Sequence, residues 1–523
     1  MAAPLNSWPS SLGTEPSAAV HGQWTNISVN LRHLVAYQGT DTSVNYFLAR
    51  FSPARHATPL ASRQPTELRF ARRLHVSLLR CEARRPGNGC RGEDARSKNW
   101  PAKFRWMPGS ILEIAAATMP SMTETISIDG VGPMPLARVG SISELRDLVR
   151  TSAERGDAIY PVGGRTMLDL GNPPTRAGTA PDLTGLNQVI DYPARDMTIT
   201  VQAGIRLAEL QRVLAGENQR LPIDVPRPEQ ATLGGAIACN ASGPRRYGFG
   251  TLRDYVIGIS VMDEQGVETK AGGRVVKNVA GYDLCKLHVG ALGTLGIVTQ
   301  VTLKVRPRPE ASALLAATVG AGQLANALDA LHVSRTRPCA IEALSPAAAA
   351  ELLPDATQWC MLIGFEDNRA ATSWQVETLR KELNECGASV LRLWHDAESE
   401  PVWRWLADWP SRGSGVSFKA TLPSARVAEF ARQLVECSPH LLAHAGDGVV
   451  LGCMSAEALQ GLRSRLQAQL SSWNGSLVLT RCSVDLKREF SVWGPARADW
   501  KLMQAIKGNL DPKNLFNPGR FVA

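Results

Sequence analysis

The chain has 523 residues and a composition, 44% hydrophobic and 20% charged, that is ordinary for a folded protein of two or three domains. Its longest apolar run, near residues 111–119, is shorter than the roughly 18–20 residues that a membrane-spanning helix needs, so we expect a cytoplasmic protein or one at the inner face of the cell membrane. The net charge of +9 is concentrated before Met119, where 15 basic residues outnumber 7 acidic ones, and the nearly neutral remainder argues against a nucleic-acid-binding surface.

Residues 1–118 are rich in Arg, Pro and Ala and keep no helical or strand period, which predicts a disordered segment or one translated upstream of the real start. Ordered patterning begins after Met119. Ser141 and Glu144 form an S-x-x-E capping signal, the apolar spacing that follows is helical, and Gly156 can end that helix. Further elements are then expected in this order: a short strand at 158–162, a helix near 207–214, and a hairpin whose turn is Asp263–Gly266.

The character of the chain changes near residue 311. Ala- and Leu-rich helical stretches then alternate with short strands, without glycine-rich loops, to about residue 483. This pattern predicts an α+β protein with a first domain at 119–310, a smaller α+β domain at 311–483 and a C-terminal tail at 484–523.

Three glycine-rich stretches are candidate binding loops. In "PVGGRTML", Gly163 and Gly164 directly follow a strand, so their backbone N–H groups can converge on phosphate oxygens, although a simple tight turn has the same pattern. Residues 226–256 combine glycines with small residues that would let a flat ligand lie against the backbone. In "VGALGTLGIVTQVTLKV" the glycines precede a strand, whereas the Rossmann fingerprint places the strand first. One extended ligand held by several loops fits this spacing better than a single pyrophosphate-binding helix.

Four segments carry a resemblance to a known family. "PVGGRT", "TLGGAIACNASGPRRYGFGTLRDYV", "KNVAGYDLCKLHVGALGTLGIVT" and "DPKNLFNPGRF" occur in the order seen in FAD-linked oxidases with a p-cresol methylhydroxylase (PCMH)-type FAD domain. "GPRR" and "KNVAGYDL" resemble the E subunits of glycolate oxidase in particular. The resemblance covers residues 119–310 and the tail at 484–523, and it implies a two-part, VAO-like FAD-binding domain with a smaller α+β cap or substrate domain.

The same resemblance implies which residues hold FAD. The first loop would wrap the pyrophosphate, the second segment would lie along the ribityl chain and the flavin, and the third would contact the nucleotide end, while the C-terminal tail returns to the flavin. The residues that match these positions are Val162, Gly163, Gly164, Arg165, Thr166, Met167, Thr232, Leu233, Gly234, Gly235, Ala238, Ser242, Gly243, Arg245, Gly293, Gly296, Ile297, Val298 and Asn517.

Two positions bear on how the flavin would be attached. Family members with covalent flavin carry a His or Cys at particular places in these loops, whereas position 165 here is Arg, so we expect non-covalent FAD. His288 lies close to the third loop and could contact the flavin, although a packed or exposed histidine is the simpler interpretation.

Related hydroxy-acid dehydrogenases carry H-x-G-D-G-N-x-H and a later E-H-G, which supply metal and acid–base groups. Here "HAGDGVVLG" keeps the first His and the Asp, but Val449 replaces the Asn, Gly452 stands near the second His, and no E-H-G occurs. A lone His cannot complete a site that needs three or more protein ligands, so we expect no metal. The weak catalytic candidates are Arg245 and Arg246, which could clamp a carboxylate, and His444.

The ten cysteines are scattered without a CxxC cluster, so iron–sulfur ligation by this chain is not expected. The resemblance implies an FAD-binding subunit of a glycolate oxidase-like complex that oxidises glycolate to glyoxylate. Its partners would be a second FAD-linked hydroxy-acid oxidase subunit (D-type) and an iron–sulfur subunit (F-type) that carries electrons onward. The alternatives are a self-contained FAD-dependent 2-hydroxy-acid or alcohol dehydrogenase, and a flavin-retaining assembly subunit.

Overall fold

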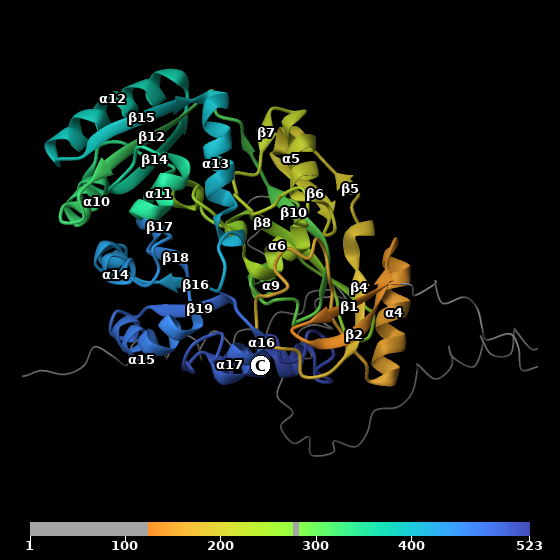
Figure 1. Ribbon diagram of the computed structural model, residues 1–523. Coiled ribbons are helices and arrows are strands. Elements are labelled where there is room, and N and C mark those ends of the chain that lie inside the picture. Colours follow the sequence, from red (N-terminus) through yellow and green to blue (C-terminus); the bar gives the residue numbers. More distant parts are fainter. Residues whose placement is uncertain (1–123, 276–281, 523) are drawn as a thin grey trace, which may run out of the picture. The chain divides into compact units, whose positions relative to one another are not determined.

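The computed structural model describes residues 124–275 and 282–522 (Figure 1). The expectation for residues 1–118 and the "KNVAG" part of the third segment lie outside this range. The described residues combine helices with four sheets, which is the α+β architecture expected from the sequence.

The first sheet has the strand order β1-β2-β4-β3, and β4 runs parallel to both of its neighbours. Its strands are β1 (Thr125–Ile128), β2 (Val131–Arg138), β3 (Ala158–Ile159) and β4 (Gly178–Asp182). Helix α4 (Ile142–Arg155) connects β2 to β3 and begins where the capping signal predicts: the Ser141 side chain accepts a hydrogen bond from the Glu144 amide. Gly156 ends the helix in the left-handed conformation at φ 73°, as expected.

The strand expected at 158–162 is shorter in the structure. β3 ends at Ile159, and Val162 forms only an isolated bridge with Asp182. Pro161 lies between them and has no N–H to donate to a ladder, which is why regular pairing stops there. The C-terminal tail pairs beside β3, because Ile159 bridges to the fully buried Phe516.

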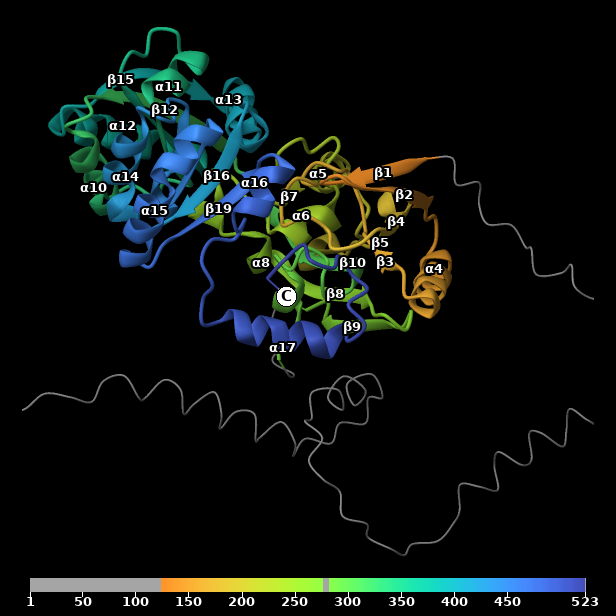
Figure 2. The same ribbon diagram turned by 60° about the horizontal axis from the view of Figure 1, so that its bottom comes forward.

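The second sheet is antiparallel, with the order β5-β6-β10-β8-β9. β8 and β9 form the expected hairpin, with the Gly266 amide donating to the Asp263 carbonyl in its turn. Several helices pack against this sheet through a shared apolar core, and β8 and β10 lie side by side in both views (Figure 1, Figure 2). The elements are β5 (Val189–Asp191), β6 (Thr198–Gln202), α5 (Leu207–Ala215), α6 (Leu233–Cys239), α7 (Arg246–Phe249), α8 (Leu252–Tyr255), β8 (Val256–Met262), β9 (Glu268–Gly272), α9 (Cys285–His288) and β10 (Ile297–Lys304); β7 (Gln219–Arg220) pairs separately with β11 (Arg306–Pro307).

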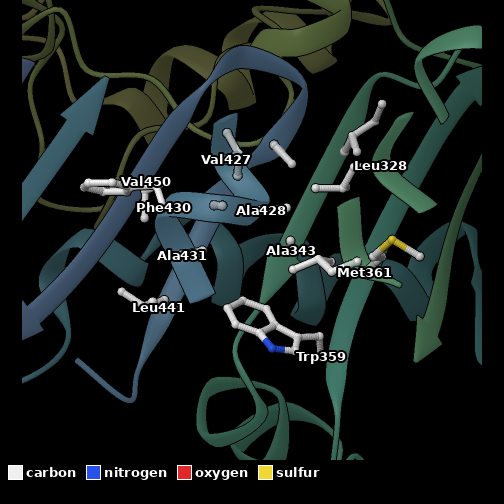
Figure 3. Packing of buried hydrophobic residues seen from close by; sticks show 14 of the residues in the cluster. Leu328, Ala343, Trp359, Met361, Val427, Ala428, Phe430, Ala431, Leu441 and Val450 are labelled. Atoms are coloured by element: carbon white, nitrogen blue, oxygen red, sulfur yellow. The ribbon is translucent and has the colours of Figure 1, made fainter. Parts of the chain in front are cut away.

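The third large sheet has eight antiparallel strands in the order β15-β12-β14-β13-β17-β18-β16-β19. Four helices cover one face, where Phe430 of α14 packs with Ala343 and Val450 in a continuous apolar layer (Figure 3). Two shorter helices bury Trp403, Leu406 and alanines against the other face. The strands are β12 (Ala311–Val319), β13 (Ala340–Leu344), β14 (Trp359–Asp367), β15 (Ser389–His395), β16 (Val416–Thr421), β17 (Leu441–His444), β18 (Val449–Met454) and β19 (Ser476–Arg481); the helices are α10 (Leu324–Val333), α12 (Arg369–Glu385), α14 (Val427–Leu434) and α15 (Ala456–Ser472) on the first face and α11 (Pro346–Leu352) and α13 (Glu400–Ala407) on the second.

The chain then continues through α16 (Val484–Glu489) and α17 (Trp500–Leu510). α17 holds the tail in place through Lys507, whose ammonium donates to the Asp511 carboxylate at 2.5 Å and to the carbonyls of Thr294 and Phe516. The Asp511 carboxylate in turn accepts the amides of Leu515 and Phe516. This buried cluster fixes the path of residues 511–517 beside the first sheet.

Candidate cofactor and substrate site

Two adjoining cavities form the candidate site. The loop cavity is lined by residues 161–168, by one side of α6 and by Leu292, Asn517 and Arg520. The main cavity has a volume of about 520 Å³ and is lined by residues from both the glycine-rich loops and the eight-stranded sheet. This volume lies in the range of small-molecule sites. The two cavities share six lining residues: Thr166, Met167, Leu170, Pro226, Cys239 and Ala241.

The glycine pair of the first loop is required by a close backbone approach. A Cβ on Gly163 would lie 2.1 Å from the Thr232 hydroxyl oxygen, and a Cβ on Gly164 would lie 1.8 Å from the Gln230 carbonyl oxygen. Because any side chain would collide there, the loop can reach the start of α6 only with glycine at these two positions. The residues predicted for this loop, Val162–Met167, all line the loop cavity.

The backbone of this loop is held by its carbonyls and open at its amides. Arg227 donates to the Thr166 carbonyl, Lys487 to the Asp169 carbonyl, and Arg520 to the carbonyls of residues 168, 170 and 172. The N–H groups of residues 163–169, by contrast, donate to no described residue. Backbone amides need acceptors, and a run of free amides beside three cations is a suitable environment for phosphate oxygens.

The cations that hold the loop are themselves fixed by one carboxylate. Asp129 accepts from Lys487 at 2.8 Å through one oxygen and from Arg520 at 2.5 Å through the other. All three side chains are buried. Lys487 and Arg520 hold this loop and were not predicted from the sequence. Arg520 ends the "NPGR" motif, whereas nothing in the local sequence of Lys487 indicates its role.

Arg165 contributes its backbone rather than its charge to the loop cavity. Its guanidinium pairs with Asp182 at 2.9 Å and with Glu124 at 3.2 Å, and its φ of 56° lets the loop turn. These carboxylates raise the pKa of Arg165 against the effect of burial. His288 does not line either cavity; it is buried, and burial lowers its pKa to about 4.

The second predicted segment lies between the two cavities. Thr232, Gly235 and Ala238 line the loop cavity, and Ser242 lines the main cavity. Three other predicted residues instead support the segment from behind. Leu233 is fully buried, Gly234 packs on Ala203, and Gly243 packs on Asp224.

The third glycine-rich loop supports α6 more than it lines the cavity. Gly290 and Leu292 donate their amides to the carbonyls of Ile237 and Ala238 at the end of α6. Only Leu292 of this loop reaches the loop cavity, together with Asn517, whose side-chain amide donates to the Leu292 carbonyl at 2.7 Å. The other predicted residues here do not line either cavity: Gly293 and Gly296 occupy tight turns, and Ile297 and Val298 are buried in β10.

Arg245 was predicted both as an FAD contact and as a catalytic candidate, and the structure does not bring it to either cavity. Its guanidinium pairs with Asp224 at 2.6 Å and with Glu366 of β14 at 2.8 Å, and it stacks on Trp403. The Arg245 side chain is only 11% exposed, and its guanidinium is engaged by the carboxylates of Asp224 and Glu366. Arg245 therefore connects the loop region to the eight-stranded sheet. The adjacent Arg246, in contrast, lines the main cavity.

The eight-stranded sheet supplies polar side chains to the main cavity. Arg246 donates to Ser242 at 3.1 Å and lies 3.6 Å from Asp447. Lys419 of β16 lines the same cavity without an ion pair to any described residue, and burial, together with Arg246, lowers its pKa to about 8. The sequence reasoning missed Lys419, although a lysine between the buried Phe418 and Ala420 of a strand is an available signal.

His444 also lines the main cavity, with its Nδ1 2.7 Å from Glu342. The remnant motif around it forms the turn between β17 and β18, with Gly448 at φ 68°. Among the described residues, no group of three or more His, Cys, Asp or Glu is placed to hold a metal ion.

Two family comparisons correspond to the two halves of the loop cavity. Residues 133–272, which carry the first loop and α6, match the FAD binding domain, and residues 487–521, which carry Lys487, Asn517 and Arg520, match the C-terminal domain of FAD linked oxidases. Both matched segments are therefore similar to those of FAD-linked oxidases. The cofactor of this chain is FAD. The close approach of the first loop to the start of α6, the unbonded amides of residues 163–169 and the three nearby cations fit the diphosphate of that cofactor.

Several curated proteins similar to this chain carry names of hydroxy-acid enzymes. A D-2-hydroxyglutarate dehydrogenase from Xanthomonas citri pv. viticola is 27% identical over 74% of this chain and 89% of its own length. Glycolate oxidase subunit GlcE from Escherichia coli is 39% identical, but over only 29% of this chain and 43% of its own length. Glycolate oxidase subunit GlcD from Bacillus subtilis is 25% identical over 73% of this chain and 87% of its own length.

A solved structure shows the same fold. Alkyldihydroxyacetonephosphate synthase covers 73% of this chain and 76% of its own with a TM-score of 0.54, at 17% identity. This likeness supports the PCMH-type FAD-binding architecture expected from the sequence. No helix in the described part of the chain is long and apolar enough to cross a membrane.

Proposed function

We propose that this FAD-linked oxidase oxidises a small 2-hydroxy acid, such as glycolate, to the 2-oxo acid. The observation that carries the proposal is the continuity of the two cavities. The loop cavity, which fits FAD, adjoins the main cavity, which is lined by Arg246 and Lys419. Two cations in a largely buried cavity suit a substrate carboxylate. The names of the curated relatives, which include glycolate oxidase subunits and 2-hydroxy-acid dehydrogenases, support the same substrate class.

In this proposal, different residues of the chain bind the cofactor and the substrate. The amides of residues 163–169 bind the diphosphate of a non-covalently held FAD, while Arg227, Lys487 and Arg520 orient that loop. Lys419 and Arg246 bind the substrate carboxylate and so place the carbon that bears the hydroxyl group. Bound FAD supplies the two-electron acceptor for the oxidation.

The chain acts in this proposal as the E-type subunit of a glycolate oxidase-like complex at the inner face of the membrane. Its partners are a D-type FAD-linked subunit and an F-type iron–sulfur subunit. The match to GlcE, at 39% identity within the loop-bearing region, supports this assignment. A self-contained 2-hydroxy-acid dehydrogenase is the second candidate, because the D-2-hydroxyglutarate dehydrogenase relative aligns over 89% of its length.

Anaerobic reduction of the bound flavin tests the proposal without requiring a partner or an electron acceptor. Full-length protein is purified, and acid precipitation should release its yellow chromophore into the supernatant if FAD is held non-covalently. Glycolate, D-lactate or D-2-hydroxyglutarate is then added, and loss of the visible flavin absorbance is expected with at least one of them. An FAD-loaded protein that none of these acids bleaches, alone or with D- and F-type subunits, contradicts the proposed reaction.

A further inference from the structure

The wall of the main cavity contains two histidine–glutamate pairs that differ in burial. His444 lies 2.7 Å from Glu342, with side chains only 4% and 1% exposed. His440 lies 2.8 Å from Glu351, with side chains 44% and 39% exposed. Both histidines line the cavity, so the same pair of residue types occurs once deep in the protein and once near solvent.

The buried pair is built by the register of two strands. Glu342 of β13 lies directly opposite His444 of β17, so the two side chains meet as cross-strand neighbours. The contact uses Nδ1 of the ring, which leaves Nε2 as the nitrogen available to the cavity. A carboxylate that fixes one ring nitrogen orients the imidazole and determines which nitrogen can take a proton.

Glu342 keeps a buried oxygen that makes no hydrogen bond. Its Oε1 atom has no partner among the described residues, although its Oε2 is bonded to His444. Such a buried, half-satisfied carboxyl lowers stability, and a strand position in an apolar sheet would be more stable with an apolar residue. Glu342 therefore fits a chemical role better than a stabilising one.

We propose that the Glu342–His444 pair accepts the hydroxyl proton when the substrate is oxidised; the proposal rests on the 2-hydroxy-acid oxidation described above. The substrate O–H bond breaks and its proton goes to His444 Nε2. The C–H bond on the same carbon would break, bound FAD would supply the acceptor for its electron pair, and the C=O bond would form. The products are the 2-oxo acid, reduced FAD and a protonated pair, so atoms and charge balance.

Burial opposes charge on each member of the pair. It lowers the pKa of His444 to about 4 and raises the pKa of Glu342 well above its usual range, because each group alone is penalised for carrying charge. Taken together, the pair changes from one net negative charge to none when it accepts a proton, which burial favours. The charged groups that face it are Arg246 and Lys419, which oppose proton uptake, and Asp447 and Asp224, which favour it.

The experiment measures anaerobic flavin reduction by the most effective 2-hydroxy acid across mildly acidic to mildly alkaline pH. In the wild type the rate should rise with pH as the pair loses its exchangeable proton. His444→Gln should lower the maximal rate by about 10² to 10⁴-fold and remove this pH dependence, as expected for loss of a general base. Glu342→Gln, which keeps the shape of the side chain, should lower the rate by about 10-fold or more and alter the rise of the rate with pH.

The exposed pair provides the matched control. His440→Gln and Glu351→Gln change the same residue types at the same cavity, and they should leave the rate and its pH profile unchanged. Flavin absorbance reports whether each variant retains FAD. If His444→Gln does not retain FAD, the result for Glu342→Gln decides the test. A Glu342→Gln or His444→Gln enzyme with wild-type rate and profile, or a loss of rate equal in both histidine variants, overturns the proposal.

A second measurement does not depend on turnover. In protein carrying [13C]histidine, the resonance that disappears in His444→Gln belongs to His444, and it should titrate with the pair in the wild type. In Glu342→Gln the midpoint of this titration should move to lower pH, because the ring loses the carboxylate that stabilises its protonated form; an unchanged titration overturns the pairing. A protein whose flavin no 2-hydroxy acid reduces, yet whose His444 titrates with Glu342, contradicts the proposed reaction rather than the coupling of the pair.

Discussion

The loop at residues 162–169 and the loop at residues 289–296 both carry glycines beside a strand, and both match the sequence pattern of a nucleotide-binding loop. In the first loop the carbonyls are held by Arg227, Lys487 and Arg520, and the amides of residues 163–169 donate to no described residue. In the second loop the amides of Gly290 and Leu292 are bonded to α6. The first loop therefore offers a continuous run of amides to a ligand, whereas the second loop uses the amides of Gly290, Ala291, Leu292 and Thr294 for hydrogen bonds within the protein.

This difference shows that glycine content alone does not identify a binding loop. Glycine allows a close approach or a left-handed turn, and both loops use it in that way. Only the hydrogen-bond partners of each amide separate the two cases. The following substitutions test that separation, beginning with the largest expected effect.

Gly164→Ala should abolish FAD retention. The new Cβ would lie 1.8 Å from the Gln230 carbonyl oxygen, so the loop must move and its free amides lose their arrangement. Gly290→Ala is the matched change in the second loop, where the nearest atom is 3.5 Å away and φ is 83°. It should cost about 1–2 kcal/mol of unfolding free energy while FAD remains bound.

Flavin content after gel filtration and thermal unfolding measure these two outcomes. If Gly290→Ala loses FAD while Gly164→Ala retains it, the assignment of the two loops is reversed.

Lys507→Met should destabilise the protein by about 3–5 kcal/mol, since it leaves the Asp511 carboxylate buried without its cation. Lys507 also donates to the Thr294 carbonyl of the second loop, so this change tests the supporting role of that loop. Denaturant unfolding of FAD-loaded protein measures the effect. The exposed Lys501→Met on the same helix is the control and should leave stability unchanged.

Arg520→Gln should weaken FAD binding by about 10- to 100-fold, corresponding to one or two lost charge-assisted hydrogen bonds. It releases the carbonyls of residues 168, 170 and 172, so the first loop no longer keeps its amides directed at the ligand. FAD affinity is measured by flavin fluorescence on reconstitution. Arg497→Gln changes an exposed arginine of the same tail, and a similar loss there would refute the loop-specific explanation.

Acidification should destabilise the region that leads into the second loop. Burial lowers the pKa of His288 to about 4, below its usual value of 6.5, so the unfolded chain binds a proton that the folded chain does not. Stability conferred by the neutral ring is present above pH 6.5 and falls toward pH 4, with a loss of about 1 kcal/mol between pH 7 and about 5.5. In His288→Gln the dependence of the melting temperature on pH should be shallower over this range, and an equally steep dependence would exclude His288 as its source.

Much of the fold could be predicted because its signals are local. Ser141 and Gly156 mark the ends of α4, and the turn at 263–266 marks the β8–β9 hairpin. The strand at 158–162 was predicted too long because the apolar pattern outweighed Pro161. The first loop was recognised because Gly163 and Gly164 are adjacent and follow a strand.

The sequence by itself determined the α+β architecture, the FAD-binding resemblance and the loop at 162–167. Only the tertiary structure decided which glycine loop keeps a run of unbonded amides, and that Arg245 is buried between two carboxylates while Arg246 lines the main cavity. It also decided that Lys419 lines that cavity, that Lys487 holds the first loop and that Glu342 lies against His444. The physical reason is that ion pairs and carbonyl contacts form between residues far apart in the chain: Lys487 lies 358 positions from Asp129, and His444 lies 102 positions from Glu342. A local pattern shows what a segment can form, whereas the partner that a polar group finds depends on the folded chain.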